Sequence, residues 1–163
     1  MLAEFGYGVL LVSLVVAIYS GIAAVNGALN KSAATVESAR RAMLLTFPLI
    51  SIAAGTLIYL LVNNHYEVAF VYEVTSRSMP TYLKITAWWG GQAGSLVFWS
   101  WLLAVFTSAV TLRKWDRDIE FLPWVILVSS VTLTFFLGMT ALFENPFARY
   151  WVSNGNVVPS MFA

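Results

Sequence analysis

Four long stretches of this sequence contain no Asp, Glu, Lys or Arg, and they limit what the chain can fold into more than any other feature. They cover residues 5–30, 42–64, 85–112 and 121–143. Each exceeds the roughly 20 residues that an α-helix needs to cross a hydrocarbon core about 30 Å thick. The sequence therefore predicts an all-α, polytopic membrane helical bundle with four transmembrane helices.

The composition agrees with a membrane protein. Hydrophobic residues make up 60% of the chain and charged residues 10%, whereas soluble domains average about 45–50% and 25%. We treat residues 1–163 as a single membrane region with an outward loop at 63–85 and a tail at 144–163 that reads as truncated. The transmembrane helices are predicted at about residues 5–29, 42–62, 86–112 and 121–143.

The basic residues predict how the bundle is oriented. Six of the nine lie in the two loops that join the first helix to the second and the third to the fourth: Lys31, Arg40, Arg41, Arg113, Lys114 and Arg117. Because cytoplasmic loops carry an excess of Lys and Arg, these loops should face the cytoplasm. The N-terminus, the 63–85 loop and the tail then face outward.

Little in the chain suggests catalysis or metal binding. It has no cysteine, so thiolate metal sites and cysteine nucleophiles are excluded within it. The acidic residues Asp116, Asp118 and Glu120 lack the other ligands of a calcium loop and predict a solvated connector. The single histidine, His65, could ligate haem iron or shuttle protons, but in a polar turn we favour a structural role. A net charge of +1 gives no general attraction to nucleic acid.

The most unusual stretch is Trp88–Trp99, where small residues and one amide lie among tryptophans. On a continuous helix Trp88, Gln92, Ser95 and Trp99 would share one face; alternatively, the glycines unwind the first turns. The stretch is either an interfacial aromatic belt with close helix packing, or an outward surface for a flat ligand such as a porphyrin or for a partner helix. The candidate binding residues are Trp88, Trp89, Gly90, Gly91, Gln92, Gly94, Ser95 and Trp99.

The loop before this stretch has a different character. Residues 68–74 are rich in β-branched and aromatic side chains. We expect this segment to lie along the membrane surface, partly as a short extended or amphipathic stretch, with Tyr66, Tyr72 and Tyr82 at headgroup depth.

The Trp88–Trp99 stretch resembles the WGGxxGSLLxW signature of the CcmF family, the haem lyase subunits of bacterial cytochrome c maturation. Residues 72–82 and the Glu144–Phe147 turn are also similar to segments of that family. Two departures matter: Ala93 stands where the family usually has Glu, and the tryptophan-rich WWD domain and haem-liganding histidines of the family lie beyond this sequence. Trp115-Asp116 is predicted on the wrong side of the membrane to replace them.

The resemblance implies an amino-terminal portion of a haem lyase in the bacterial inner membrane, as a fragment or one piece of a split protein. It implies transient b-type haem with iron ligands outside this chain. The implied partners are the haem chaperone CcmE, CcmH-type subunits, apocytochrome c and the remainder of CcmF. This portion would scaffold the core and shape the outward entrance for haem or apocytochrome without catalysing alone. The alternative is a non-enzymatic membrane scaffold or a transporter-associated subunit.

Overall fold

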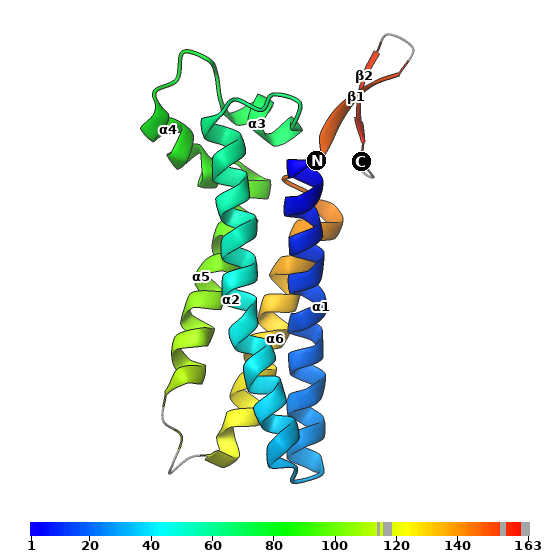
Figure 1. Ribbon diagram of the computed structural model, residues 1–163, viewed down its shortest axis with the longest axis vertical. Helices are drawn as coiled ribbons and strands as arrows, with labels where there is room; N and C mark the ends of the chain where they lie inside the picture. Colours follow the sequence, from blue (N-terminus) through cyan, green and yellow to red (C-terminus); the bar gives the residue numbers. More distant parts are fainter. Residues whose placement is uncertain (114, 116–118, 154–155, 161–163) are drawn as a thin grey trace.

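The computed structural model is an up-and-down bundle of four long helices, and it describes residues 1–113, 115, 119–153 and 156–160 (Figure 1). The long helices are α1 (Leu2–Leu29), α2 (Ala33–Val62), α5 (Gln92–Leu112) and α6 (Leu122–Gly138), the last extended by a π-helical turn, η3 (Met139–Phe143). Four helices in the described chain are long and apolar enough to span a membrane. The predicted all-α fold class, with four candidate membrane-spanning helices, is therefore confirmed.

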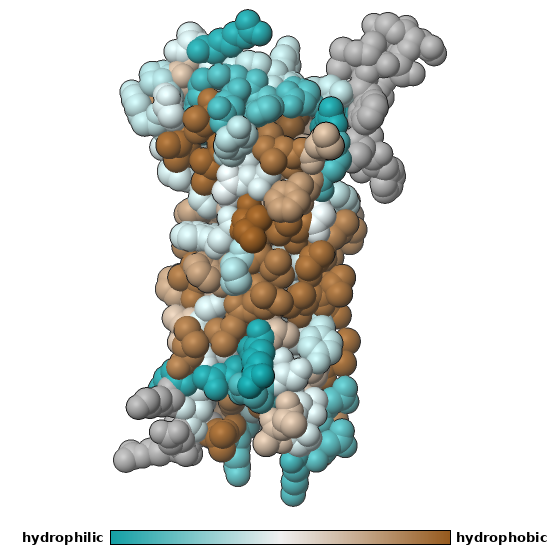
Figure 2. Space-filling model, in the orientation of Figure 1, coloured by the Kyte–Doolittle hydropathy of each residue, from teal (hydrophilic) through white to brown (hydrophobic). Residues whose placement is uncertain are grey.

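The connections gather at two ends of the bundle. The α1–α2 turn and the start of the short helix η2 (Ile119–Phe121) lie at one end (Figure 1). The N-terminus lies at the other end with two short helices, α3 (Ala69–Val74) and α4 (Thr81–Thr86). Following the orientation that the basic residues predict, we name these the inner end and the outer end. Figure 2 shows hydrophobic side chains over the middle of one face, with hydrophilic ones gathered towards both ends.

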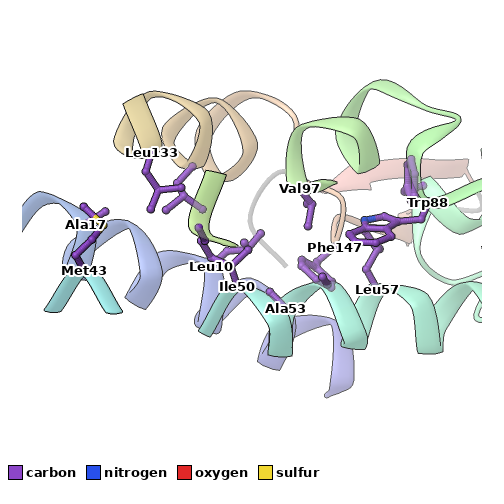
Figure 3. Packing of buried hydrophobic residues seen from close by; sticks show 14 of the residues in the cluster. Leu10, Ala17, Met43, Ile50, Ala53, Leu57, Trp88, Val97, Leu133 and Phe147 are labelled. Atoms are coloured by element: carbon purple, nitrogen blue, oxygen red, sulfur yellow. The ribbon is translucent and has the colours of Figure 1, made fainter. Parts of the chain in front are cut away.

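Helix α1 packs against both α2 and α6, and small residues make this close approach possible. A side chain at Gly21 would collide with the Ser130 hydroxyl of α6, whose oxygen would lie 2.5 Å from the added carbon. The Ser20 hydroxyl donates a hydrogen bond across the interface to the Ala39 carbonyl oxygen of α2, at 2.9 Å. Between the helices lies one continuous apolar core, which includes Leu10, Ile50 and Leu133 (Figure 3).

Two helix boundaries differ from the apolar stretches. Helix α2 begins at Ala33, well before the uncharged stretch, and its first turns carry the charged side chains of the inner end. Ser32 caps the helix by accepting a hydrogen bond from the Thr35 backbone N–H at 3.4 Å. The third span begins at Gln92, and not near residue 86, because the chain breaks at two glycines. The predicted connector residues Lys114, Asp116, Arg117 and Asp118 lie outside the described residues.

The outer end holds two elements that sequence patterns described poorly. Of the two predicted alternatives, residues 69–74 form an amphipathic helix and not an extended stretch: Phe70 and Val71 are buried against the bundle although their types favour strands, and Tyr72 is exposed. The tail contains an antiparallel hairpin of β1 (Arg149–Ser153) and β2 (Asn156–Ser160), with Arg149 opposite Ser160. In the sequence an Asn-Gly pair separates these strands, and this dipeptide is a strong hairpin signal.

Candidate functional site

The Trp88–Trp99 stretch is a broken helix and not a continuous one. Helix α4 leads into a 3-10 turn, η1 (Ala87–Trp89), two glycines follow, and α5 starts at Gln92. Gly91 is the extended residue that precedes α5, and its carbonyl oxygen accepts the first helical bond from the Ser95 N–H at 2.9 Å. The prediction that Trp88, Gln92, Ser95 and Trp99 share one helical face is therefore wrong, and the alternative that the glycines interrupt the helix is confirmed.

Trp88 faces inward from this break. It is only 7% exposed, and its ring meets Phe98 edge to face with centroids 5.2 Å apart. It also lies 6.1 Å from Trp101, whose indole N–H donates to the Ser51 hydroxyl of α2 at 3.0 Å. Figure 3 shows Trp88 among the core residues beside Leu57. Trp88 therefore belongs to the core, where offset and edge-on aromatic pairs add to the apolar burial.

Trp89 and Trp99 face outward instead. They are 47% and 54% exposed, and both rings lean on Phe98, at centroid distances of 5.6 and 6.2 Å. The Ser95 hydroxyl donates to the Trp89 carbonyl oxygen at 2.8 Å and ties the 3-10 turn to the first turn of α5. Gln92 is exposed nearby and has no side-chain hydrogen bond within the described residues. We call Trp89 and Trp99 with Gln92 the outward aromatic face.

Gly91 and Gly94 form a notch, and the ring of Phe70 from α3 occupies it. A side-chain carbon added at Gly91 would lie 2.8 Å from the Phe70 ring, and one added at Gly94 would overlap both the Phe70 ring and the Trp88 carbonyl oxygen. Gly90 differs, because an added carbon there meets nothing closer than 3.4 Å. The small residues thus serve packing within this chain, and the notch is filled by a protein side chain and not left open to a flat ligand.

Polar residues of the 63–85 loop hold α4 in place above α2. The Lys84 ammonium group, on a residue only 6% exposed, donates to the Asn64 side-chain oxygen at 2.5 Å. Asn64 has a positive φ of 58°, a conformation that Asn tolerates better than most residues, and it also accepts a hydrogen bond from the Tyr66 hydroxyl at 3.0 Å. Sequence reasoning missed Lys84, because nothing in the pattern distinguishes a buried lysine from an interfacial one.

His65 pairs with Glu67 at the same end. The His65 Nδ1 atom lies 2.8 Å from a Glu67 carboxylate oxygen, and its ring lies 6.0 Å from that of Tyr59. Burial acts to raise the pKa of Glu67, but a backbone hydrogen bond and His65 together outweigh it and hold the pKa below its usual value. The pair is consistent with the structural role that we favoured for this histidine.

Comparison with known proteins shows which proteins the chain is similar to. It is 32% identical over 149 residues to the cytochrome c-type biogenesis protein CcmF of Haemophilus influenzae, which covers 91% of this chain and 23% of that protein. The chain is a homologue of the amino-terminal portion of CcmF. It is also 26% identical to CcmF of Escherichia coli and 29% identical to CycK of Rhizobium meliloti, over the same share of this chain. No family profile matches the chain.

A solved structure of the cytochrome c haem lyase CcmF has the same fold. It superposes with a TM-score of 0.85 over 90% of this chain and 25% of that protein, at 20% sequence identity. The chain thus spans about a quarter of the length of the CcmF proteins that it matches. The prediction of a CcmF-like helical bundle is confirmed, and cytochrome c biogenesis is the function that the relatives' names give.

In the described part of the chain, the outward aromatic face contains no iron ligand. His65, the single histidine, pairs with Glu67 through Nδ1, so Nε2 is the ring nitrogen that this pairing leaves for another partner. No group of three His, Cys, Asp or Glu side chains that could hold a metal occurs among the described residues. The outward aromatic face instead provides apolar contact area and one amide side chain.

Proposed function

We propose that this chain forms the amino-terminal helical scaffold of a CcmF-type haem lyase for cytochrome c maturation, in the inner membrane of a bacterium. The observation that carries the proposal is the 149-residue match to CcmF proteins, which runs through all four helices. The fold similarity to a CcmF haem lyase supports the same assignment.

Within that assembly the chain would act as a structural scaffold and would not supply catalytic groups. Its core fixes Trp88, and the outward aromatic face of Trp89, Gln92 and Trp99 is rigidly presented at the outer end. We propose that this face contacts haem or apocytochrome c, whose iron ligands and thiols come from elsewhere. The partners would be the haem chaperone CcmE, CcmH-type subunits and the remaining three quarters of a CcmF protein.

Two measurements test the proposal. In the first, the chain and full-length Haemophilus influenzae CcmF are purified after growth with excess haem, and bound haem is followed by absorbance. The full-length protein should retain haem and the chain should not; strong axial ligation by the chain alone would overturn the scaffold assignment.

In the second, the chain replaces the matching residues of that CcmF in a strain lacking its own protein, and covalent cytochrome c is measured by haem staining. We expect maturation to be restored. A Trp89→Ala/Trp99→Ala double variant should lower it, with Trp124→Ala, an equally exposed tryptophan on α6, as the matched control. A chimera that reaches the membrane in normal amounts yet yields no cytochrome c would refute the assignment.

A further inference from the structure

One phenylalanine of α5, Phe98, contacts three tryptophan rings at the outer end. Its ring centroid lies 5.2 Å from that of Trp88, 5.6 Å from that of Trp89 and 6.2 Å from that of Trp99. Trp88 is buried, whereas Trp89 and Trp99 are the two exposed rings of the outward aromatic face. Phe98 itself is half-buried. Its ring therefore connects the core to the outward aromatic face.

The core side of Phe98 rests on a fixed support. The Trp88 ring meets Phe98 at an interplanar angle of 89°, the edge-to-face geometry that aromatic pairs favour. Trp88 also contacts the ring of Trp101, whose indole N–H donates to the Ser51 hydroxyl of α2 at 3.0 Å. Ring contacts and one hydrogen bond thus connect Phe98 to the neighbouring helix. Because close-packed rings can turn only if their neighbours move, the orientation of Phe98 is set by the core.

The two exposed tryptophans depend on Phe98 for their orientation. Within the described part of the chain, neither the Trp89 nor the Trp99 side chain has another ring contact or a hydrogen bond. The Ser95 hydroxyl bonds to the Trp89 carbonyl oxygen, which fixes the backbone and not the indole. The planes of Trp89 and Trp99 are inclined to that of Phe98 by 42° and 67°. The angle between the two indoles, and with it the shape of the face, therefore depends on this one ring.

We propose that Phe98 is a positioning residue of the outward aromatic face, which holds the Trp89 and Trp99 indoles in the orientation that contacts haem or apocytochrome c. The inference rests on the proposed function of that face. A partner that binds a mobile side chain must also order it, and a side chain that is already held avoids this cost. Phe98 holds two such side chains at once. Loss of its ring should therefore weaken the contacts of both, although Phe98 itself need not touch the partner.

Fluorine NMR of the purified chain, labelled with 5-fluorotryptophan, tests whether Phe98 holds the indoles. Single Trp-to-Phe substitutions assign the signals of the seven tryptophans. Phe98→Leu keeps much of the apolar volume but removes the ring. The Trp89 and Trp99 signals should then shift, because the ring current is lost, and narrow, because the indoles become mobile. Trp124, an exposed tryptophan of α6 without a ring partner among the described residues, should keep its signal.

Cytochrome c maturation by the chimera described above tests whether this positioning is used. Phe98→Leu should lower the yield of covalent cytochrome c roughly fivefold, the factor that corresponds to ordering about one side chain on binding. Phe98→Tyr retains the ring and should restore both the NMR signals and maturation. Phe106→Leu is the matched control, since this phenylalanine of the same helix is 66% exposed and has no ring partner in the described part of the chain. It should change neither measurement.

Three results would overturn the positioning role. The first is a folded Phe98→Leu chain whose Trp89 and Trp99 signals are unchanged. The second is normal maturation by the Phe98→Leu chimera when the Trp89→Ala/Trp99→Ala chimera is impaired. The third is an equal loss for Phe98→Leu and Phe98→Tyr, which would indicate a general packing defect. Failure of the proposed contact role is recognised separately, by normal maturation in the Trp89→Ala/Trp99→Ala chimera itself.

Discussion

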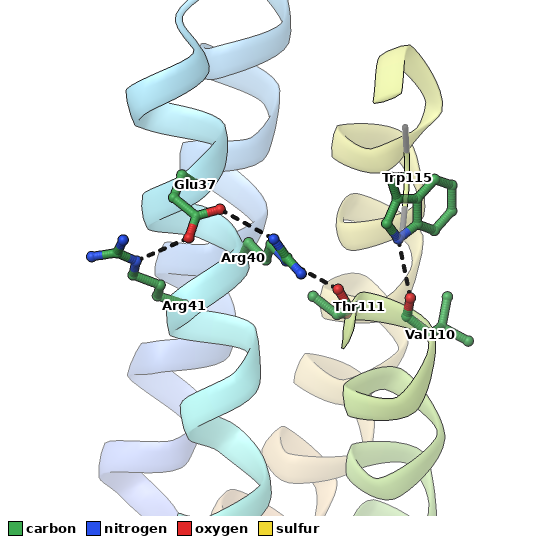
Figure 4. Close-up of polar contacts among 6 residues, drawn as sticks. All are labelled: Glu37, Arg40, Arg41, Val110, Thr111 and Trp115. Carbon is green, nitrogen blue, oxygen red and sulfur yellow. Dashed lines mark hydrogen bonds and ion pairs between the residues drawn. The ribbon is translucent and has the colours of Figure 1, made fainter. Parts of the chain in front are cut away.

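The inner and outer ends of this bundle are held together by different kinds of contact. At the inner end, side-chain tips bond to helix termini: the Arg40 guanidinium donates to the Thr111 carbonyl oxygen of α5 at 3.0 Å, and the Trp115 indole donates to that of Val110 at 3.1 Å (Figure 4). At the outer end, a ring and a backbone carbonyl press directly against glycines, as Phe70 and the Trp88 carbonyl do at the notch of Gly91 and Gly94.

This difference indicates which amino-acid substitutions the fold should tolerate. The tips of long side chains at a water-exposed end can move, and solvent replaces their bonds at small cost. Backbone and ring atoms that are packed against glycine cannot retreat without moving a helix. Substitutions at Gly91 and Gly94 should therefore cost much more than substitutions of Arg40 or Arg41, and the following experiments measure that gradient.

The largest effect is expected for Gly94→Leu. The new side chain would overlap the Trp88 carbonyl oxygen and the Phe70 ring, so the chain should lose about 3 kcal/mol of folding free energy or fail to fold. Gly91→Leu should cost less, because only side-chain atoms of Phe70 and Val74 oppose it. The measurement is unfolding in mixed micelles with increasing SDS, followed by circular dichroism.

Gly55→Leu is the matched control for this comparison. Gly55 lies in the middle of α2, and an added carbon there meets no atom within 4 Å. The Gly55→Leu variant should be about as stable as the unaltered chain. His65→Ala should likewise lower the folding free energy by less than either notch substitution. If Gly94→Leu unfolded at the same SDS fraction as Gly55→Leu, the notch would not be a packing constraint.

A smaller effect at the outer end is expected for Lys84→Met. The change keeps most of the buried stem but leaves the Asn64 amide oxygen without its charged donor, which should cost about 2 kcal/mol. Lys31→Met, at the exposed inner turn, is the matched control and should change stability by less than about 0.5 kcal/mol. Equal midpoints for the two variants in the same SDS titration would show that the Lys84 bond contributes nothing.

The gradient also explains which parts of the fold the sequence could predict. The four spans follow from the length of the uncharged stretches alone. Lipid offers no hydrogen-bond partners, so a stretch of this length pairs its backbone groups internally by forming a helix. The spans depend on local composition, but the predicted starts of the second and third spans were wrong, since α2 begins at Ala33 and α5 at Gln92.

The outer end depended on contacts that no local pattern contains. Whether Gly91 and Gly94 face a ligand or a side chain is decided by where α3 places Phe70, some 20 residues earlier in the sequence. The same holds for Trp88 and Trp89, which are adjacent in sequence: that Trp88 is buried and Trp89 exposed depends on how the η1 turn packs against the bundle. Sequence alone located the candidate site but could not divide it into a buried and an exposed half.

At the inner end, the expected losses are small. Arg40→Gln removes a cation from the carbonyl end of α5 and should cost at most about 1 kcal/mol, the usual range for a charge at a helix terminus. Arg41→Gln removes only the exposed pair with Glu37 and should cost about 0.3–0.5 kcal/mol. Both differences should shrink when the titration is repeated in 1 M salt. A loss for Arg40→Gln as large as that for Gly94→Leu would break the proposed contrast between the two ends.

The smallest effect is expected for Glu67, and its pH dependence shows whether the pair with His65 stabilises the outer end at all. Because the folded-state pKa of Glu67 lies below its ordinary value of 4.5, the ionised carboxylate favours the folded chain at every pH above 4.5. That contribution is lost as the pH falls through the lowered folded-state value. Glu67→Gln should therefore be a few tenths of a kcal/mol less stable than the unaltered chain at pH 7, and this difference should vanish in titrations well below pH 4.5. A difference that stayed constant over this range would mean that Glu67 acts through packing and not through its charge.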